Sequence, residues 1–392
     1  MNRFQYKSIR DIKYQKVGLW LGILVFMRTM PCYLWGLEDI LRPLCTILIM
    51  LICIKNISQE KWTYWILLCI ASAYVWATVF VDNSGIVTIV NFLAFAFIPT
   101  LKREVVHETY KVFRKLFVIF LGLSIINYLL VLIGFDFGGT VIEPLNKLKK
   151  YKYVMYPFLV TPIGHEFSRF HSIFDEPGVV GTLSGLMLIA EQMNLQKKSN
   201  YIILIGGLLS LSFYFYVSMI FGFILFSKKL QNKWLYISLL VGFIVISYNN
   251  DFLYDKLWHR FEYDATSGKF AGDNRNSTVV ENAYESIAGT PLFFTGLGSA
   301  ATEEFSGSAS LQLIILKHGF IFVALNLLGY LLLSIRQIKN RSDLIFFFVF
   351  FILTLYQRPG FYNTASIFLY VMVINMFGRN KEIAIPLTRH NK

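Results

Sequence analysis

The sequence predicts an all-α membrane protein, because its composition, its apolar runs and the placement of its charges all favour that class. Hydrophobic residues make up 55% of the 392 residues and charged residues only 16%, with a mean hydropathy of +0.53. A soluble chain would be roughly 45–50% apolar and about 25% charged. Aromatic residues reach 17%, as expected where they fill lipid-facing and interfacial positions. We therefore expect a polytopic bundle of membrane-crossing helices.

Apolar runs of spanning length recur along the chain. A helix needs roughly 20 mostly apolar residues to cross a bilayer. The first run follows a polar, basic start and lacks a small-residue cleavage site, so we expect it to remain as the first span. The expected spans are 17–36, 39–54, 62–81, 84–101, 116–135, 177–195, 234–249, 311–334, 343–357 and 361–377.

The stretch 201–227 needs its own interpretation, because basic residues flank it on both sides. It is long for one helix and short for two full spans. Hydroxyl-bearing residues within Ser210–Ser218 favour a turn between two short helices. Counted as two segments, the stretch brings the total to about 12 and places both termini in the cytoplasm. Counted as one, it would place the basic tail 379–392 outside, so we prefer the hairpin.

Basic residues gather between the apolar runs. The net charge is +13, which alone would suggest a nucleic-acid partner. However, 24 of the 37 Lys and Arg fall in seven short segments, as the positive bias of cytoplasmic loops predicts. The basicity is therefore a topology signal, and we expect no nucleic-acid binding. The segments are 1–16, 55–61, 101–115, 196–200, 228–233, 335–343 and 378–392.

This topology places the two long polar stretches, 136–176 and 250–310, on the same periplasmic side, where each is expected to contain short helices. The second loop carries nine Asp and Glu against four Lys and Arg, the reverse of the cytoplasmic segments. That reversal supports the same orientation. No repeat or low-complexity linker divides the chain, so residues 1–392 are interpreted as a single integral membrane domain.

The densest polar cluster ends the first long loop. Arg169, His171, Asp175 and Glu176 lie within eight residues, directly before a glycine-interrupted apolar run. Pro177 suits the first turn of a helix that Asp175 or Glu176 would cap. One interpretation is only a capped helix beside a solvated loop. The other, which we prefer, is a site at the membrane surface where small residues hold the helix start close to a lipid-linked phosphate.

A second polar cluster lies in the second long loop. Residues 277–288 predict a short helix with Asn274 or Asn276 near its start, and its apolar face is expected to rest on the membrane surface. Arg275 precedes this helix, and the functional question is whether it meets Arg169 across the loops. The apolar face consists of residues spaced by three and four: Val280, Ala283, Tyr284 and Ile287.

These motifs together resemble a known family. The pattern Arg169-x-x-Ser-x-Phe-x-Glu-Pro-x-x-x-Gly181, followed by Arg275 and by Pro291-Leu-Phe-Phe-Thr-Gly-Leu-Gly298, resembles the O-antigen polymerases of the Wzy type. That family is related to the O-antigen ligases. The topology, with an arginine motif in each of two outer loops, matches as well, so the resemblance covers nearly the whole chain.

The resemblance implies a glycosyltransferase of the bacterial inner membrane that uses no nucleotide sugar and no cofactor. Such enzymes move a growing glycan from undecaprenyl diphosphate onto the next lipid-linked repeat unit, on the periplasmic face. The implied partner is an undecaprenyl-diphosphate-linked oligosaccharide, and a chain-length regulator and a flippase of the same pathway are further candidates.

The reaction needs cations more than a general acid, because a sugar hydroxyl attacks an anomeric carbon while a lipid diphosphate departs. Neither outer loop holds an Asp-x-Asp pair, and all four cysteines lie in the first apolar runs, so we expect no metal site. Arginine can grip phosphate oxygens in two places. Arg169 and Arg275 are the first candidates, with Arg358 and Asn274 as further contacts to the diphosphate or glycan.

The sequence leaves the general base open. Glu176, Asp175 and His171 could each accept the proton of the acceptor hydroxyl, and Glu176 is slightly preferred.

Two arginines lie in or beside the first apolar runs. A charge at the bilayer centre costs roughly 2.5–3.5 kcal/mol on insertion scales, so Arg28 and Arg42 carry a functional hypothesis by default. The alternative is that they reach toward the interface or pair with Glu38 and Asp39.

Two other functions remain possible on the sequence. Ligases related to this family usually carry a His-Asn pair in the second loop, but residues 307–312 contain no histidine, which favours a polymerase. A transporter or lipid flippase would need polar residues near the middle of the bilayer. The polar residues here concentrate in the outer loops, which favours chemistry at the membrane surface.

Overall fold

The structure is a computed structural model, and it is mostly helical, as predicted. It describes residues 9–81, 95–144, 151–164, 169–226, 233–251, 253–254, 258–259, 262–264, 269–270, 278–298, 310–357, 359–361 and 363–383.

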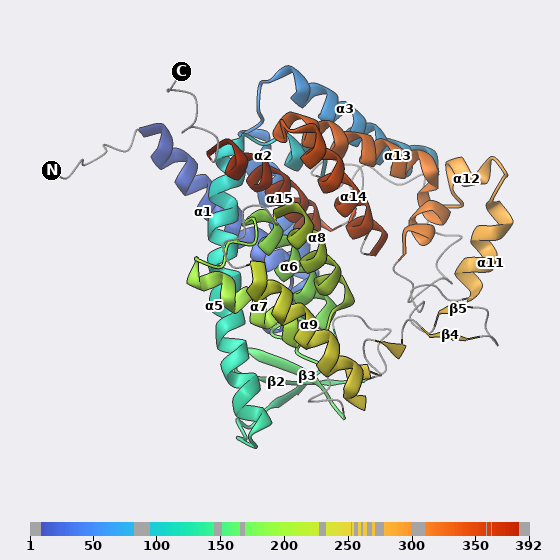
Figure 1. The fold of residues 1–392 in the computed structure, drawn as a ribbon. Coiled ribbons are helices and arrows are strands. Elements are labelled where there is room, and N and C mark those ends of the chain that lie inside the picture. Colours follow the sequence, from blue (N-terminus) through green and yellow to red (C-terminus); the bar gives the residue numbers. More distant parts are fainter. Residues whose placement is uncertain are drawn as a thin grey trace.

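The helices follow the apolar runs in chain order (Figure 1). The α-helices of the described residues are α1 (Ile9–Arg28), α2 (Glu38–Ile54), α3 (Lys61–Val75), α5 (Arg103–Leu132), α6 (Pro177–Ala190), α7 (Lys198–Leu209), α8 (Phe213–Phe226), α9 (Lys233–Asn249), α11 (Thr278–Ile287), α12 (Leu292–Thr295), α13 (Leu311–Gln337), α14 (Arg341–Gln357) and α15 (Thr364–Ile383). Short helices of other types are the 3₁₀ turns η1 (Cys32–Leu37) and η3 (Ile98–Thr100) and the π-helical η2 (Trp76–Val81).

Three helices in the described part of the chain are long and apolar enough to cross a membrane: Lys61–Val79, Arg103–Leu132 and Leu311–Gln337. Four shorter apolar helices accompany them: Pro177–Ala190, Lys198–Leu209, Phe213–Phe226 and Thr364–Gly378. Most of the expected span 84–101 lies outside the described residues.

The expected first span, 17–36, is wrong in its bounds. The helix α1 begins eight residues earlier, inside the polar start, and ends at Arg28. Met30 then adopts a left-handed backbone conformation (φ 52°), and Pro31 precedes the 3₁₀ turn η1. A proline has no N–H to continue a helix, so the break occurs here although the sequence stays apolar.

The hairpin expected in 201–227 is confirmed as two short helices. The helix α7 ends at Leu209, and α8 begins at Phe213, after a turn in which Leu211 has a positive φ of 47°. Ser210 Oγ donates to the carbonyl of Gly207 (2.6 Å), which helps to close the end of α7.

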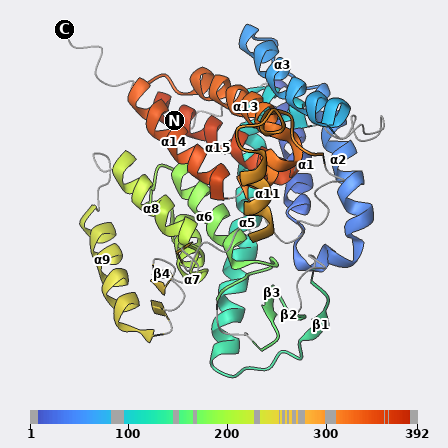
Figure 2. The same cartoon turned by 90° about the vertical axis from the view of Figure 1, so that its right-hand side faces the viewer.

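In the first long loop the described residues form a β-sheet and not the short helices that were predicted. Antiparallel strands β1 (Thr140–Ile142), β2 (Tyr153–Tyr156) and β3 (Leu159–Pro162) pair in the order β1-β2-β3. Their aromatic and β-branched residues favour strands once they have a surface to pack on. Figure 2 shows that surface to be the lower half of α5.

The second long loop does contain the short helix predicted for 277–288, now α11. Its apolar face packs against α13 instead of lying on the membrane surface: Val280 and Ile287 are buried against Leu313 and Leu316. The loop also holds one short antiparallel ladder, between β4 (Tyr263–Asp264) and β5 (Lys269–Phe270).

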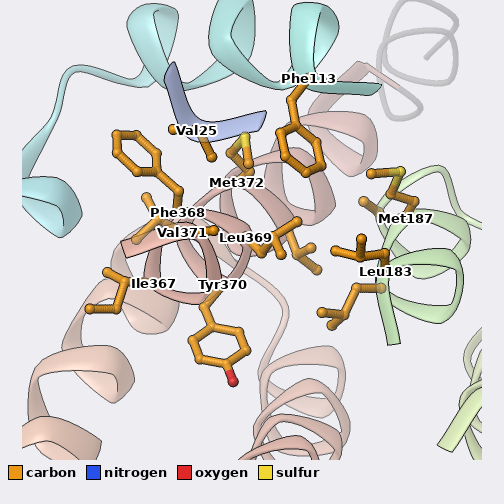
Figure 3. Packing of buried hydrophobic residues seen from close by; sticks show 14 of the residues in the cluster. Val25, Phe113, Leu183, Met187, Ile367, Phe368, Leu369, Tyr370, Val371 and Met372 are labelled. Carbon is orange, nitrogen blue, oxygen red and sulfur yellow. The ribbon is translucent and has the colours of Figure 1, made fainter. Parts of the chain in front are cut away.

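The helix α15 lies at the centre of the core. Figure 3 shows its residues Phe368, Leu369 and Met372 surrounded by side chains from α1, α5 and α6. Residues 364–378 are buried all round, as expected of a short apolar helix that is wrapped by its neighbours. Because α15 begins close to the candidate site described below, this packing fixes the position of one of its walls.

Basic segments that the sequence places in the cytoplasm meet at one end of the structure. Ile57 forms an isolated β-bridge with Leu101. Arg336 donates from Nε to Glu60 Oε2 (2.7 Å), and Arg103 donates from Nη2 to the carbonyl of Arg336 (2.9 Å). We call this region the basic end and define it by the segments 55–61, 101–115, 196–200 and 335–343.

A buried ion cluster completes the basic end. The side chain of Glu191, at the end of α6, is only 3% exposed. Its carboxylate forms ion pairs with Arg114 (3.4 Å) and Lys197. Tyr110 also donates to it (3.0 Å). Arg114 further donates to Asn200 Oδ1 (2.5 Å), so one carboxylate and one guanidinium join α5, α6 and α7.

Candidate functional site

A cavity of about 370 Å³ lies at the opposite ends of α2, α6 and α15 from the basic end. Its volume lies within the range of small-molecule sites, roughly 300–1,000 Å³. Three parts of the chain that the sequence places on the outer side contribute to it. They are the α1–α2 junction (Arg28, Thr29, Met30, Arg42), the start of α6 (Asp175, Glu176, Val179, Thr182, Leu183) and the start of α15 (Asn363, Ala365, Ser366, Leu369). We call this region the cavity end.

The floor between α6 and α15 is apolar. Leu183 of α6 and Leu369 of α15 both line the cavity and lie opposite each other in Figure 3. Charged and polar side chains stand around this floor, an arrangement typical of ligand sites in which apolar surface gives contact and a few polar groups give orientation.

Two of the predicted carboxylates, Asp175 and Glu176, line the cavity. Glu176 occupies the N-cap position of α6 with extended backbone (φ −140°, ψ 134°), and Pro177 follows as the first helical residue, as predicted. The Glu176 side chain makes no capping hydrogen bond to α6 within the described residues. The positive end of the α6 dipole stabilises a negative charge at both positions.

Tyr153 of strand β2 fixes the backbone of this acidic pair. Its hydroxyl donates to the carbonyl of Asp175 (2.6 Å). Burial, contact with Tyr151 and the nearby charges of Asp175 and Glu176 raise the pKa of Tyr153 well above its ordinary value. The phenol therefore stays protonated and remains a hydrogen-bond donor across the physiological range. The unpredicted sheet thus has a clear role, which is to hold the loop that carries the carboxylates.

Small residues of α6 admit a neighbouring helix. A side chain at Gly181 would meet Ser212 Cβ at 2.2 Å, and one at Gly185 would meet Ser218 Oγ at 2.6 Å. These two glycines therefore allow the α7–α8 turn and α8 to pack closely against α6, and the predicted approach of a phosphate to the start of α6 stays a prediction.

Arg28 and Arg42 lie in the same cavity, from α1 and α2. Arg42 pairs with Glu38 one helical turn earlier (2.9 Å), so the predicted pairing is confirmed for this arginine. Arg28 behaves differently: among the described residues, its Nη2 donates to Thr364 Oγ1 alone, at the long distance of 3.4 Å. Its Nε is buried and has no hydrogen-bond partner among the described residues.

The other predicted residues of the first cluster lie outside the cavity lining. Arg169 donates from Nε and Nη2 to the carbonyls of Ser210 and Leu211, both at 3.1 Å, and so holds the α7–α8 turn. His171 is buried, with its ring edge-on to Tyr153 at 6.1 Å between centroids.

Arg275, Asn274 and Arg358 lie outside the residues that the structure describes, so their predicted contacts stay predictions. Asn363, close behind Arg358 in the chain, does line the cavity and caps α15: its Oδ1 accepts from the backbone of Ala365 (2.9 Å).

The glycine motif of the second loop lies on a kink in α13. Gly319 has a positive φ of 79°, which interrupts the helix and leaves carbonyls of the preceding turn without helical partners. Leu297 donates its backbone N–H to the carbonyl of Leu316 (2.7 Å), and Gly298 donates to that of Lys317 (3.0 Å). The motif Pro291–Gly298 therefore joins the second loop to α13.

Within the described part of the chain, no group of three or more His, Cys, Asp or Glu is placed to hold a metal ion. Asn363 could have been found from the sequence, because an Asn-Thr pair before an apolar run is an N-cap signal. The presence of Arg28 in the same cavity as Asp175 and Glu176 could not, since these residues are about 150 positions apart in the chain.

The chain matches no protein-family model, no curated protein and no solved structure. Its function is therefore inferred from its own residues.

Proposed function

We propose that this protein is a polymerase of lipid-linked polysaccharide repeat units, in the inner membrane of a bacterium. It would transfer the growing glycan from undecaprenyl diphosphate onto the next lipid-linked repeat unit on the periplasmic face. One observation carries the proposal: the predicted carboxylates Asp175 and Glu176 share a cavity with two guanidiniums, those of Arg28 and Arg42.

The orientation follows from the charge bias of the loops. The basic end faces the cytoplasm in this proposal, because positively charged segments are retained there. The cavity end then lies near the outer surface, where a substrate anchored in the bilayer can reach it. About 12 membrane segments, with both termini in the cytoplasm, complete the topology, and the long apolar helices in the described part of the chain support it.

The charges of the cavity suit glycosyl transfer from a diphosphate. The acceptor hydroxyl forms a bond to the anomeric carbon, and the bond from that carbon to the diphosphate oxygen breaks with its electron pair. The hydroxyl proton passes to a carboxylate, for which Glu176 is the first choice and Asp175 the second. Guanidiniums balance the charge that collects on the departing diphosphate.

The predicted arginine contacts enter the proposal in different roles. Arg275, Arg358 and Asn274 are proposed to bind diphosphate or glycan from the outer side. Arg169 is proposed to act as a positioning residue, because its guanidinium holds the turn that packs against the start of α6. His171 is the third choice for the base, since it is buried beside Tyr153.

Complementation tests the proposal. The gene would be expressed with the matching repeat-unit genes in a cell that lacks its own polymerase, and surface glycan would be resolved by size. A ladder of long chains is expected. If the lipid A–core acceptor carries only a single repeat unit, the protein is not a polymerase. Loss of all surface glycan on deleting the gene, with polymer still present on the carrier, would point to a ligase.

Matched acidic variants locate the reaction. Glu176→Gln should abolish the ladder at an unchanged level of protein in the membrane. The control is Glu143→Gln, which removes a carboxylate of the same loop that pairs only with exposed Lys152 among its described contacts. A full ladder from Glu176→Gln would move the base to Asp175 or His171, which the corresponding variants would then test.

A further inference from the structure

Arg28 is a cation without a counter-charge in the described part of the molecule. Among the described residues Arg28 forms no ion pair with a carboxylate, and its hydrogen bond to Thr364 Oγ1 is long, at 3.4 Å. Its Nε is buried without a partner among the described residues. A second guanidinium, that of Arg42, lines the same cavity, and its charge opposes that of Arg28.

Such an arrangement carries a cost. The Arg28 side chain is half-buried, and a guanidinium that loses water around its Nε without gaining a partner there is less stable than a paired one. Replacement of Arg28 by an apolar residue would remove that cost, yet the sequence places a guanidinium here. An anion between Arg28 and Arg42 would compensate both charges and would accept the hydrogen bond that Nε has available.

The two walls of the cavity carry opposite charges. Arg28 and Arg42 come from α1 and α2, whereas Asp175 and Glu176 stand at the start of α6. A ligand with an anionic group at one end and a sugar at the other matches this division. The anion would meet the arginines, and the sugar carbon would face the carboxylates. The start of α15, capped by Asn363, adds a positive helix end to the cavity lining.

We propose that Arg28 and Arg42 form the subsite for the diphosphate group of the lipid-linked donor, and that Glu38 holds Arg42 until the donor binds. Glu38 pairs with Arg42 at 2.9 Å. When a diphosphate binds, it replaces Glu38 as the ion-pair partner of Arg42. Glu38 therefore competes with the ligand, and its removal strengthens binding. The identity of the ligand rests on the proposed function, but the anion site itself does not.

Binding to the purified full-length protein tests the subsite. The protein would be placed in nanodiscs of neutral phosphatidylcholine, and titrated with inorganic pyrophosphate, with a soluble prenyl diphosphate and with the corresponding prenyl alcohol. Both diphosphates are expected to bind, and the alcohol is expected not to. Binding of the prenyl diphosphate alone would assign the site to a lipid headgroup, and equal binding of both would show that the phosphate chemistry suffices. Equal binding of the alcohol would overturn the proposal.

Three variants make the test specific. Arg28→Met should weaken binding of the prenyl diphosphate by roughly 10-fold or more, the change expected when a charged hydrogen-bond donor is lost. Glu38→Gln should strengthen it, and this second variant keeps the test valid if Arg28→Met folds poorly. Lys152→Gln, an exposed change in the same outer region, should leave binding unchanged. Wild-type affinity in both Arg28→Met and Glu38→Gln would overturn the proposal.

These measurements need no turnover, so they separate the two proposals. Failure to form a ladder together with Arg28-dependent binding would reject the polymerase and keep the anion site. A full ladder together with Arg28-independent binding would reject the site and keep the polymerase.

Discussion

The two ends of the helix bundle use charged residues in different ways. At the basic end, Glu191 is buried against Arg114, Lys197 and Tyr110, so each charge has partners within the chain. At the cavity end, Arg28 is left with one long hydrogen bond and a neighbour of the same charge. The helices α2, α6 and α15 each connect one end to the other.

This difference separates charges that stabilise the fold from charges that await a ligand. Where a guanidinium and a carboxylate compensate each other, removal of one partner exposes the other and the fold suffers. Where a guanidinium has no counter-charge, its removal harms ligand binding and spares the fold. The contrast gives four predictions, from the largest expected effect to the smallest.

The largest effect is expected at the buried carboxylate of the basic end. Glu191→Ala leaves Arg114 and Lys197 without their shared counter-charge, which should cost about 3–5 kcal/mol of the free energy of unfolding. Thermal unfolding of detergent-solubilised protein, followed by size-exclusion chromatography, measures the loss. Lys111→Ala, which removes an exposed pair with Glu108 (2.7 Å), should cost less than about 1 kcal/mol. If Glu191→Ala and Lys111→Ala lose the same free energy of unfolding, burial of Glu191 does not make its ion pairs more stabilising than an exposed pair.

The opposite behaviour is expected of Arg28. Arg28→Met should reduce the rate of chain growth by roughly 10- to 100-fold, since charge-assisted hydrogen bonds contribute about 1.5–3 kcal/mol. Its unfolding temperature should equal or exceed that of the wild type, because an uncompensated charge is removed. Chain growth is measured from glycan ladders at matched protein levels. A large drop in unfolding temperature would place Arg28 with the structural charges and end the contrast.

A smaller effect is expected of Arg336, the arginine of the basic end that joins α13 to the start of α3. Arg336→Met removes the hydrogen bonds to Glu60 (2.7 Å) and Ser58 (3.0 Å). Glu60 is half-exposed and can be solvated again, so the loss should be about 1–2 kcal/mol, less than for Glu191→Ala. Thermal unfolding again measures it. A loss as large as that of Glu191→Ala would show that exposure of the partner does not set the cost.

The smallest effect concerns pH. The hydrogen bond from Arg336, aided by the charges of Arg336 and Arg103, lowers the pKa of Glu60 below its usual value of 4.5. A carboxyl whose pKa is lowered in the folded state adds stability above its unfolded pKa, and this contribution is lost as the pH falls through the folded pKa. The difference in unfolding temperature between wild type and Glu60→Gln should therefore be small near pH 7, begin to shrink as the pH falls below about 4.3, and vanish only below the lowered pKa of folded Glu60. A difference that grows with acidity would contradict the direction of the shift.

Features that depend on local pattern could be predicted from the sequence. The short helices α7 and α8, the helix α11 and the start of α6 at Pro177 all follow from periodicity and end signals. Asp175 and Glu176, which the sequence marked as candidate site residues directly before a helix, do line the cavity.

Features that depend on contacts between distant segments could not be predicted. The strand β2 forms because α5 and two neighbouring strands give it partners, although its loop was expected to be helical. Arg169 looked like a phosphate ligand by residue type, but the carbonyls that it reaches belong to a turn some 40 residues later in the chain. The sequence marked Arg28 as unusual, and only the fold places it in the cavity that Asp175 and Glu176 also line.

The most direct test of the account asks which compartment each end faces. Asp39 and Lys55 are exposed residues near the two ends of α2, a helix of roughly 25 Å at about 1.5 Å per residue. Each would be replaced by cysteine in turn and treated with a membrane-impermeant maleimide, with the unsubstituted protein as the control for its four native cysteines. Asp39→Cys should react in cells whose inner membrane is intact, and Lys55→Cys only after that membrane is permeabilised. Labelling of Lys55→Cys with protection of Asp39→Cys would place the cavity in the cytoplasm and contradict a periplasmic polymerase.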